Sequence, residues 1–308
     1  MKRTMPGAQT PPLPPAEPGA DGPVGVFDSG MGGLSVLREI RKLLPKEDLL
    51  YVADSGHAPY GDRSRGFIEG RAAAIADFFL ARGVKAIVAA CNTVTGIAVD
   101  GLRERCPVPV VAIEPAIKPA AAMTTSGVVG VLATRQTIAC KRVSRLIARY
   151  GRDARILLQA CPGLAEQVER AALTSPATRA LAAKYITPLL EKGADTLVLG
   201  CTHYPFLAPL IQTIAGPEVT LINPAAAVAR ELGRRLRAEG VASGARRPGT
   251  EWFWASGPLD HAQRVITELW GSCRDVHQLP AGGARPQNSG EHRSKNGIRR
   301  PHTKRTSE

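Results

Sequence analysis

Residues 83–93 read GVKAIVAACNT, and residues 193–203 read GADTLVLGCTH. Each stretch is a short apolar run typical of a buried strand, with a cysteine eight residues after its leading glycine. Two further pairs of stretches repeat along the chain: GPVGVFDS (22–29) with GVVGVLAT (127–134), and VVAIEPA (110–116) with VTLINPA (219–225). The three offsets, 110, 105 and 109 residues, are nearly constant. The sequence therefore predicts two related halves that share one topology.

Strand-like and helix-like segments alternate in the body of the chain. The strand pattern VGVFD (24–28) precedes residues 34–44, whose leucines and isoleucine fall at helical spacing. LLYVAD (49–54) is another strand pattern, and a helical pattern over residues 67–83 follows it. Apolar strands between helices are typical of parallel sheets that are covered on both faces. We therefore expect an α/β fold of two pseudo-symmetric α/β domains with mainly parallel sheets, and an active-site cleft between them.

The two ends of the chain differ in composition from its body. The 308 residues carry a formal net charge of +13, and residues 281–308 hold seven Lys/Arg against two Glu with almost no apolar side chains. This basic tail is predicted to be disordered and solvated, with a weak contact to an anionic partner as the alternative. Residues 1–22 contain six prolines and are predicted to be a second disordered extension.

Composition also bears on the cellular compartment. No apolar run approaches the roughly 20 residues that a membrane-spanning helix needs, and the N-terminus lacks the apolar region of a signal peptide. The six cysteines form no C-x-x-C pair, which favours reduced thiols in a cytoplasmic protein over a disulfide framework.

Cys91 and Cys201 stand at matching strand ends and indicate a specific chemistry. If a substrate lies between them, one thiolate can remove a proton from one face of a carbon while the other thiol delivers a proton to the opposite face. Cysteine suits this task because its ordinary pKa of about 8.5 lies near working pH. A position just before a helix N-terminus should further favour the thiolate.

Other kinds of site are disfavoured. Cys201 and His203 could be half of a metal site, but the chain offers no second cluster with zinc-ligand spacing, so no metal is expected. The glycine-rich loop SGMGG (29–33) lacks the G-x-x-x-x-G-K-[ST] pattern of a phosphate-binding loop. Its glycines are expected to let the backbone turn tightly and approach a substrate closely. Nothing in the sequence indicates a lysine site for a cofactor, so no cofactor is expected.

Several motifs occur in the order of one known family: GVFDSGMGGLSV (25–36), YVADSGHAPYG (51–61), AACNTVT (89–95), VVAIEPA (110–116), GVLAT (130–134) and LGCTHYPFL (199–207). Over about residues 24–270, the chain resembles the glutamate racemases of the aspartate/glutamate racemase family. This resemblance implies an isomerase that interconverts L-glutamate and D-glutamate without a cofactor. It also implies that the product D-glutamate feeds peptidoglycan biosynthesis, and thereby cell wall biogenesis and cell shape.

The resemblance implies which residues form the site. The two catalytic cysteines of the family fall on Cys91 and Cys201. The substrate-binding positions fall on Asp28, Ser29, Tyr60, Gly61, Asn92, Thr93, Thr202 and His203. Asp28 is expected to pair with the substrate ammonium or to tune Cys91, and His203 to tune Cys201. Further expected members are Glu169, which aligns with a glutamate that assists the histidine, and Thr134 and Thr137, as contacts of a carboxylate.

By the same resemblance, the chain passes between domains near residues 117 and 224. The expected parts are a disordered extension (1–22), a first α/β domain (23–116 plus 224–278), a second α/β domain (117–223) and a disordered basic tail (279–308). A homodimer in the cytoplasm is expected, with glutamate as its small-molecule partner and no membrane or nucleic-acid partner. Asn223 stands where the family commonly has Asp before the proline.

Alternative functions stay open. A relative with the same cysteine pair could act on aspartate or hydantoins, whereas a single-cysteine decarboxylase is disfavoured because both cysteines are present. An alternative of another class is a regulatory protein that binds nucleic acid through its basic tail.

Overall fold

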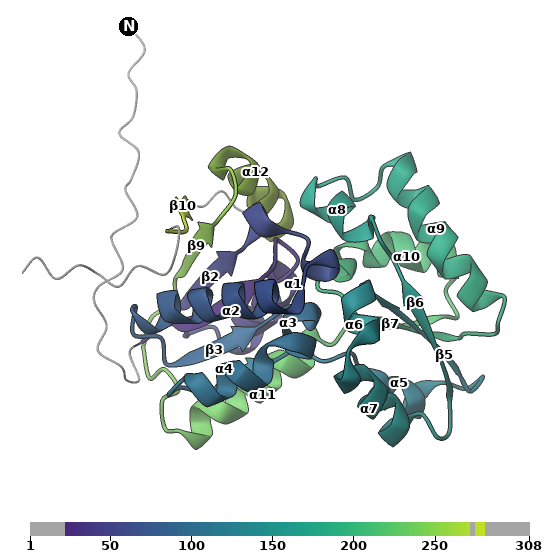
Figure 1. Ribbon diagram of the computed structural model, residues 1–308, viewed down its shortest axis with the longest axis horizontal. Helices are drawn as coiled ribbons and strands as arrows, with labels where there is room; N and C mark the ends of the chain where they lie inside the picture. The colour runs from purple at the N-terminus through teal and green to yellow at the C-terminus, as the bar shows by residue number, and fades with distance from the viewer. Residues whose placement is uncertain (1–21, 272–274, 281–308) are drawn as a thin grey trace, which may run out of the picture.

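The computed structural model describes residues 22–271 and 275–280, which form two lobes that lie side by side (Figure 1). The first lobe is built around a six-stranded sheet in the order β10-β9-β2-β1-β3-β4. The second lobe is built around a four-stranded sheet in the order β6-β5-β7-β8. The neighbouring strands in both sheets pair in parallel.

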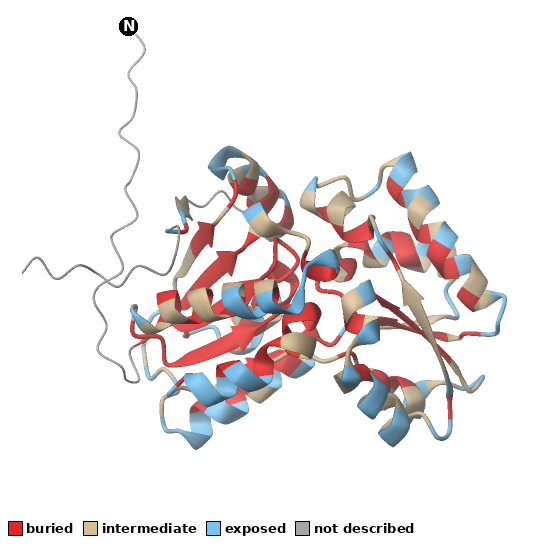
Figure 2. Ribbon diagram, viewed as in Figure 1, coloured by how far each residue is buried: buried red, intermediate tan, exposed pale blue. Residues whose placement is uncertain are grey.

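The strands of both sheets are short, and those at the centre of each sheet are buried (Figure 2). The first sheet contains β1 (Val24–Asp28), β2 (Leu49–Ala53), β3 (Ala86–Ala89), β4 (Val110–Ala112), β9 (Glu251–Ala255) and β10 (Val276–Gln278). The second sheet contains β5 (Val128–Ala133), β6 (Arg155–Ala160), β7 (Thr196–Leu199) and β8 (Thr220–Ile222).

The two sheets repeat one strand order. The order β2-β1-β3-β4 in the first lobe corresponds to β6-β5-β7-β8 in the second lobe. The three repeated pairs of sequence stretches fall on β1 with β5, β3 with β7, and β4 with β8. The predicted α/β class with two pseudo-symmetric parallel sheets is therefore confirmed. Strands β9 and β10 extend only the first sheet, and the sequence pattern predicts neither of them, nor β6.

Helices cover both faces of the first sheet. Two neighbouring side chains of β1 show this, since each enters a different hydrophobic core. Val26 packs with α1, α11 and α12, whereas Phe27 packs with α2 on the opposite face. The described helices of the first lobe are α1 (Leu34–Leu43), α2 (Arg65–Leu80), α3 (Asn92–Ile97), α4 (Val99–Arg105), α11 (Ala225–Ala238) and α12 (Leu259–Trp270). Those of the second lobe are α5 (Ile117–Met123), α6 (Arg135–Ala139), α7 (Lys141–Tyr150), α8 (Leu164–Glu169), α9 (Pro176–Leu190) and α10 (Ala208–Ala215). The short 3₁₀ segments are η1 (Ser55–His57), η2 (Tyr60–Asp62) and η3 (Tyr204–Leu207).

The predicted disordered extensions fall almost entirely on residues 1–21 and 281–308, which lie outside the described residues. Leu279, which the sequence assigns to the tail, is buried, and its N–H donates to the carbonyl of Ala255 at 2.8 Å. The folded part therefore extends beyond the predicted end at residue 278. The division into domains near residues 117 and 224 stays a prediction. None of the helices in the described ranges is long and apolar enough to cross a membrane.

A buried ion pair joins three segments at the amino-terminal edge of the first sheet. Glu47 and Lys85 lie 2.6 Å apart, and their side chains are only 4% and 2% exposed. Ser243, which follows α11, donates its backbone N–H to the same carboxylate at 2.7 Å. The pair therefore holds together the loop before β2, the start of β3 and the chain after α11.

Removing the lysine of this pair is expected to destabilise the protein. Lys85→Met leaves a buried carboxylate without its counter-charge, and such a loss lowers the free energy of unfolding by about 3–5 kcal/mol. In the double variant Glu47→Gln/Lys85→Met, the uncharged amide oxygen still accepts from Ser243, so most of the lost free energy should return. Urea unfolding of the two variants measures both effects.

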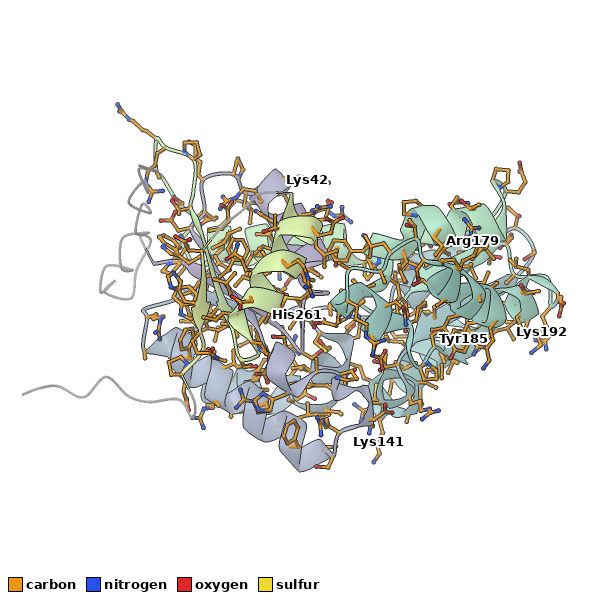
Figure 3. The ribbon with its side chains drawn as sticks, turned by 90° about the horizontal axis from the view of Figure 1, so that it is seen from above. Lys42, Lys141, Arg179, Tyr185, Lys192 and His261 are labelled. Atoms are coloured by element: carbon orange, nitrogen blue, oxygen red, sulfur yellow. The ribbon has the colours of Figure 1, made fainter. Side chains whose placement is uncertain are left out.

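Lys42→Met is the matched control for this experiment. Lys42 pairs with Glu39 at 2.7 Å but is 70% exposed on the surface of the first lobe (Figure 3). Its replacement is expected to change the free energy of unfolding by less than about 1 kcal/mol, as for other exposed ion pairs. A Lys85→Met variant that is as stable as the wild type would contradict the structural role of the buried pair.

Candidate active site

The equivalent strands β3 and β7 place two cysteines in one cavity between the lobes. Cys91 follows β3 and directly precedes α3, and Cys201 follows β7. Both line a cavity of about 20 Å³. The lining residues are Ser29, Pro59, Tyr60, Gly61, Cys91, Asn92, Thr93, Thr134, Ala165, Gly200, Cys201, Thr202 and His203.

Most of the predicted site residues line this cavity, and three lie directly behind it. Asp28 accepts a hydrogen bond from the hydroxyl of Thr202, and Thr137 accepts one from the hydroxyl of Thr134. Glu169 contacts His203. A wider cavity of about 850 Å³ lies between helices α2 and α4 of the first lobe and α6 and α7 of the second, but neither Cys91 nor Cys201 lines it. The chemistry indicated by the sequence therefore belongs to the small cavity.

The surroundings of Cys91 keep its thiol protonated. Burial raises the pKa of Cys91 to about 12, and the carboxylate of Asp28 adds to this rise. Ser29 Oγ, 3.5 Å from the sulfur, and the N–H of Val94 act in the opposite direction but more weakly. The helix N–H of Val94 favours the thiolate of Cys91 in the predicted direction, but burial and a nearby negative charge outweigh it.

Cys201 begins a chain of contacts that runs through His203 to Glu169. The sulfur lies 3.5 Å from Nδ1 of His203, and Nε2 of His203 lies 2.6 Å from Oε1 of Glu169. Burial alone would lower the pKa of His203, but Cys201 and Glu169 raise it well above its ordinary value. A protonated His203 donates to both neighbours and carries a positive charge beside the sulfur of Cys201. In the part of the chain that the structure describes, no group of three or more His, Cys, Asp or Glu side chains is arranged to hold a metal ion.

Asp28, at the end of β1, is fully buried and keeps one oxygen unpaired. Its Oδ2 accepts from the N–H of Gly33 at 2.7 Å and from the hydroxyl of Thr202 at 3.2 Å. Its Oδ1 has no hydrogen-bond partner among the described residues. Burial raises the pKa of the carboxyl group, and the positive charge on His203 opposes this rise. An unpaired buried carboxylate oxygen is unfavourable unless a ligand pairs with it, as a substrate ammonium would.

Hydroxyl groups from both lobes meet at one wall of the cavity. Thr93 Oγ1 lies 3.1 Å from Oγ1 of Thr134 and 3.4 Å from Oγ1 of Thr137. Thr134 also caps helix α6, because its hydroxyl accepts from the N–H of Thr137 at 3.2 Å. Both amide atoms of the Asn92 side chain are buried without a partner among the described residues. Hydroxyl and amide donors of this kind can bind a carboxylate.

The glycine-rich loop of residues 29–33 packs against side chains of the second lobe. A Cβ atom at Gly30 would lie 2.1 Å from Oε1 of Glu169, and one at Gly32 would lie 2.4 Å from Nδ1 of His203. Neither glycine has a positive φ, so close approach rather than a left-handed turn requires them. The sequence predicts a close approach to a substrate, whereas the structure shows a close approach to these two side chains.

Tyr60 lines the cavity, and its hydroxyl has a partner outside the cavity. The hydroxyl donates to the buried carboxylate of Asp54. A Cβ atom at the following residue, Gly61, would lie 3.2 Å from Cβ of Thr134, so this turn also touches the second lobe.

Sequence reasoning misses several residues around the cavity. Pro59, Ala165 and Gly200 line it. Pro59 and Gly200 stand inside motifs that carry the family resemblance, so their position is the available signal, whereas Ala165 stands in none of these motifs. Met31 donates its backbone N–H to Oε1 of Glu169 at 2.6 Å. Because a backbone N–H makes this contact, the type of residue at the position does not indicate it.

The chain matches a racemase family and several of its members. Residues 24–232 match the family described as Asp/Glu/Hydantoin racemase. The glutamate racemase of Methylococcus capsulatus is 54% identical over 266 residues, which cover 86% of this chain and 98% of that protein.

Two solved structures show a similar fold. The glutamate racemase of Escherichia coli, in complex with L-glutamate and the activator UDP-MurNAc-ala, is 32% identical with a TM-score of 0.75, and the match covers 84% of this chain and 98% of that one. The glutamate racemase of Francisella tularensis, in complex with D-glutamate, is 28% identical with a TM-score of 0.74, and the match covers 85% and 98%. These matches agree with the paired cysteines and the paired sheets, and the chain therefore belongs to the Asp/Glu/hydantoin racemase family.

Proposed function

We propose that this enzyme interconverts L-glutamate and D-glutamate by moving the α-proton between Cys91 and Cys201. The observation that carries the proposal is the single cavity that both thiols line from opposite lobes. The structures of the E. coli and F. tularensis relatives contain L-glutamate and D-glutamate, which supports glutamate as the substrate.

The proposed reaction needs one thiolate and one thiol at a time. For one enantiomer, the thiolate of Cys201 removes the α-proton, and the electron pair left on the α-carbon takes up the proton of the Cys91 thiol from the opposite face. Cys201 ends as a thiol and Cys91 as a thiolate. The reverse reaction then uses the same pair in exchanged roles. A second conversion in the same direction first needs one proton to pass from Cys201 to Cys91 through the solvent, and no redox partner takes part.

Polar groups around the cavity are expected to hold the substrate. The unpartnered amide of Asn92 and the hydroxyls of Thr93 and Thr134 can bind its carboxylates. The free Oδ1 of Asp28 can pair with its ammonium group. This pairing would also cancel the negative charge that helps to raise the pKa of Cys91, so substrate binding would ease formation of the Cys91 thiolate.

The cavity must widen before a substrate enters. Its volume of about 20 Å³ is enough for roughly one water molecule. Glutamate is much larger, so we expect the loops or the lobes to separate and then to close around it. Once water is excluded, the hydrogen bonds that stabilise a carbanion-like transition state become stronger.

Three further parts of the proposal rest on the family resemblance. The enzyme would supply D-glutamate for peptidoglycan biosynthesis, act in the cytoplasm and form a homodimer. The cysteines of the described residues are free thiols, which supports a reducing compartment. Light scattering tests the dimer, because a particle with the mass of one 32.6 kDa chain would contradict it.

Loss of either cysteine is expected to abolish racemisation. Cys91→Ser and Cys201→Ser should each lower the rate by about 10²–10⁴-fold or more, because a hydroxyl is a much poorer acid and base than a thiol at working pH. Circular dichroism follows the reaction from pure L-glutamate and from pure D-glutamate.

Cys140→Ser is the matched control, because Cys140 is half-buried and lies outside the cavity that the two cysteines share. It should keep wild-type turnover. Near-normal turnover in either Cys91→Ser or Cys201→Ser would contradict the proposal that both thiols move the α-proton. If the wild-type enzyme acts faster on L-aspartate than on L-glutamate, aspartate is the substrate, and the assignment of the two cysteines still holds.

Replacing Glu169 should move the pH dependence of the reaction. Glu169 helps to hold the pKa of His203 above its ordinary value, so the neutral side chain of Glu169→Gln should lower that pKa. Protonated His203 places a positive charge 3.5 Å from the Cys201 sulfur, and this charge is lost as pH rises through the pKa of His203. The activity of Glu169→Gln on L-glutamate should therefore begin to fall at a pH about one unit lower than in the wild type.

Glu166→Gln is the control for this variant, because Glu166 lies on the same helix, whereas the hydrogen bond to His203 comes from Glu169. Rates measured across the alkaline range should match the wild type in this control. A Glu169→Gln enzyme with an unshifted alkaline limb would show that Glu169 acts by packing alone.

A further inference from the structure

A buried carboxylate behind the cavity holds the turn that carries Tyr60. Asp54 is fully buried at the end of β2. Its two oxygens accept from Nε and Nη2 of Arg71, at 2.8 Å each, and Oδ2 also accepts from the hydroxyl of Tyr60. Nδ1 of His57 lies 3.0 Å from Oδ1. One carboxylate therefore ties helix α2 to both of the short turns η1 and η2.

The hydrogen bonds around Asp54 keep it charged. Burial alone would raise the pKa of Asp54, but hydrogen bonds from Arg71, Tyr60 and Ser256 lower it below its ordinary value. The Arg71 side chain is only 19% exposed. A two-point contact between a guanidinium and a carboxylate also fixes the orientation of both groups. The anchor is therefore charged and rigid at working pH.

The anchored turn forms one wall of the active-site cavity. Pro59, Tyr60 and Gly61 line the cavity, whereas Asp54 and Arg71 do not. The Tyr60 ring packs edge-on against Phe67 of α2, with ring centroids 6.2 Å apart. On its other side, the turn meets the second lobe, where Gly61 lies against Thr134. A small shift of the turn would therefore change both the width of the cavity and its contact with Thr134.

We propose that Asp54 and Arg71 are positioning residues for racemisation, which act through the Tyr60 hydroxyl to set the wall against which the substrate binds. This inference rests on the proposed function. Neither side chain touches the cavity, so their effect reaches the substrate only through the turn that they hold.

A loosened wall should weaken binding more than proton transfer. Among the described residues, the hydrogen bonds of the two sulfur atoms go to Ser29 and His203 and not to the turn, so we expect the turn to meet groups of the substrate that do not react. Such contacts are equally strong in the bound substrate and in the transition state. Their loss raises KM while kcat changes little.

The test measures kcat and KM for L-glutamate with the full-length variants Tyr60→Phe and Asp54→Asn. Tyr60→Phe removes only the hydroxyl and keeps the ring against Phe67. We expect KM to rise about tenfold in each variant, which corresponds to the loss of roughly one hydrogen bond to a charged group. We expect kcat to stay within about threefold of the wild type.

Asp77→Asn is the matched control. Asp77 lies on the same helix α2 and pairs with Arg105, but this pair is exposed and Asp77 does not line the cavity. Its KM and kcat should equal those of the wild type. Circular dichroism spectra of Tyr60→Phe should match the wild type, which separates positioning from a general loss of structure.

A folded Tyr60→Phe enzyme with wild-type KM overturns the inference. A lower kcat at unchanged KM also overturns it, because that result places the network in proton transfer. If Asp54→Asn does not fold, Tyr60→Phe decides alone. A wild-type enzyme that is inactive on glutamate would instead overturn the proposed function, so the two failures are distinguishable.

Discussion

The carboxylate of Glu169 has two roles. It helps to hold the two lobes together, and through its contact with His203 it acts on the surroundings of one thiol. Oε1 of Glu169 lies 2.6 Å from Nε2 of His203 and accepts the backbone N–H of Met31 at 2.6 Å. Met31 belongs to the first lobe, whereas the other two residues belong to the second. One carboxylate oxygen therefore docks the glycine-rich loop across the interface and supports a positive charge beside Cys201. A side chain at Gly30 would displace this oxygen, which explains why the loop lacks one there.

The two halves share a backbone plan but differ in the charges around their cysteines. The carboxylate of Asp28 adds to the effect of burial in raising the pKa of Cys91. His203, whose pKa is raised, places a positive charge next to Cys201. The two thiols therefore have opposite charges beside them. The repeated topology brings both thiols to one cavity, and the proposed proton transfer can run in either direction between them.

The sequence predicts the repeated core and the cysteines because both leave a local pattern. Strand β6 escapes prediction although Ile156, Leu157 and Leu158 are apolar, because no repeated stretch marks it. Strands β9 and β10 have no counterpart in the second lobe. Contacts between distant segments escape as well. For example, the helical spacing of residues 67–83 does not reveal that Arg71, rather than Arg65, donates hydrogen bonds to Asp54. Residue type likewise does not tell that burial outweighs the helix N-terminus at Cys91.

Deuterium incorporation from solvent tests the two-base reaction most directly. L-glutamate is converted to a small extent in D₂O. The two enantiomers are then separated, and mass spectrometry measures the deuterium content of each. The account predicts that the product D-glutamate carries one α-deuterium while the remaining L-glutamate carries almost none, because one cysteine removes the proton and the other supplies deuterium. Equal early labelling of the recovered L-glutamate would show that a single group removes and returns the proton. That result, or an unlabelled product, would contradict the account.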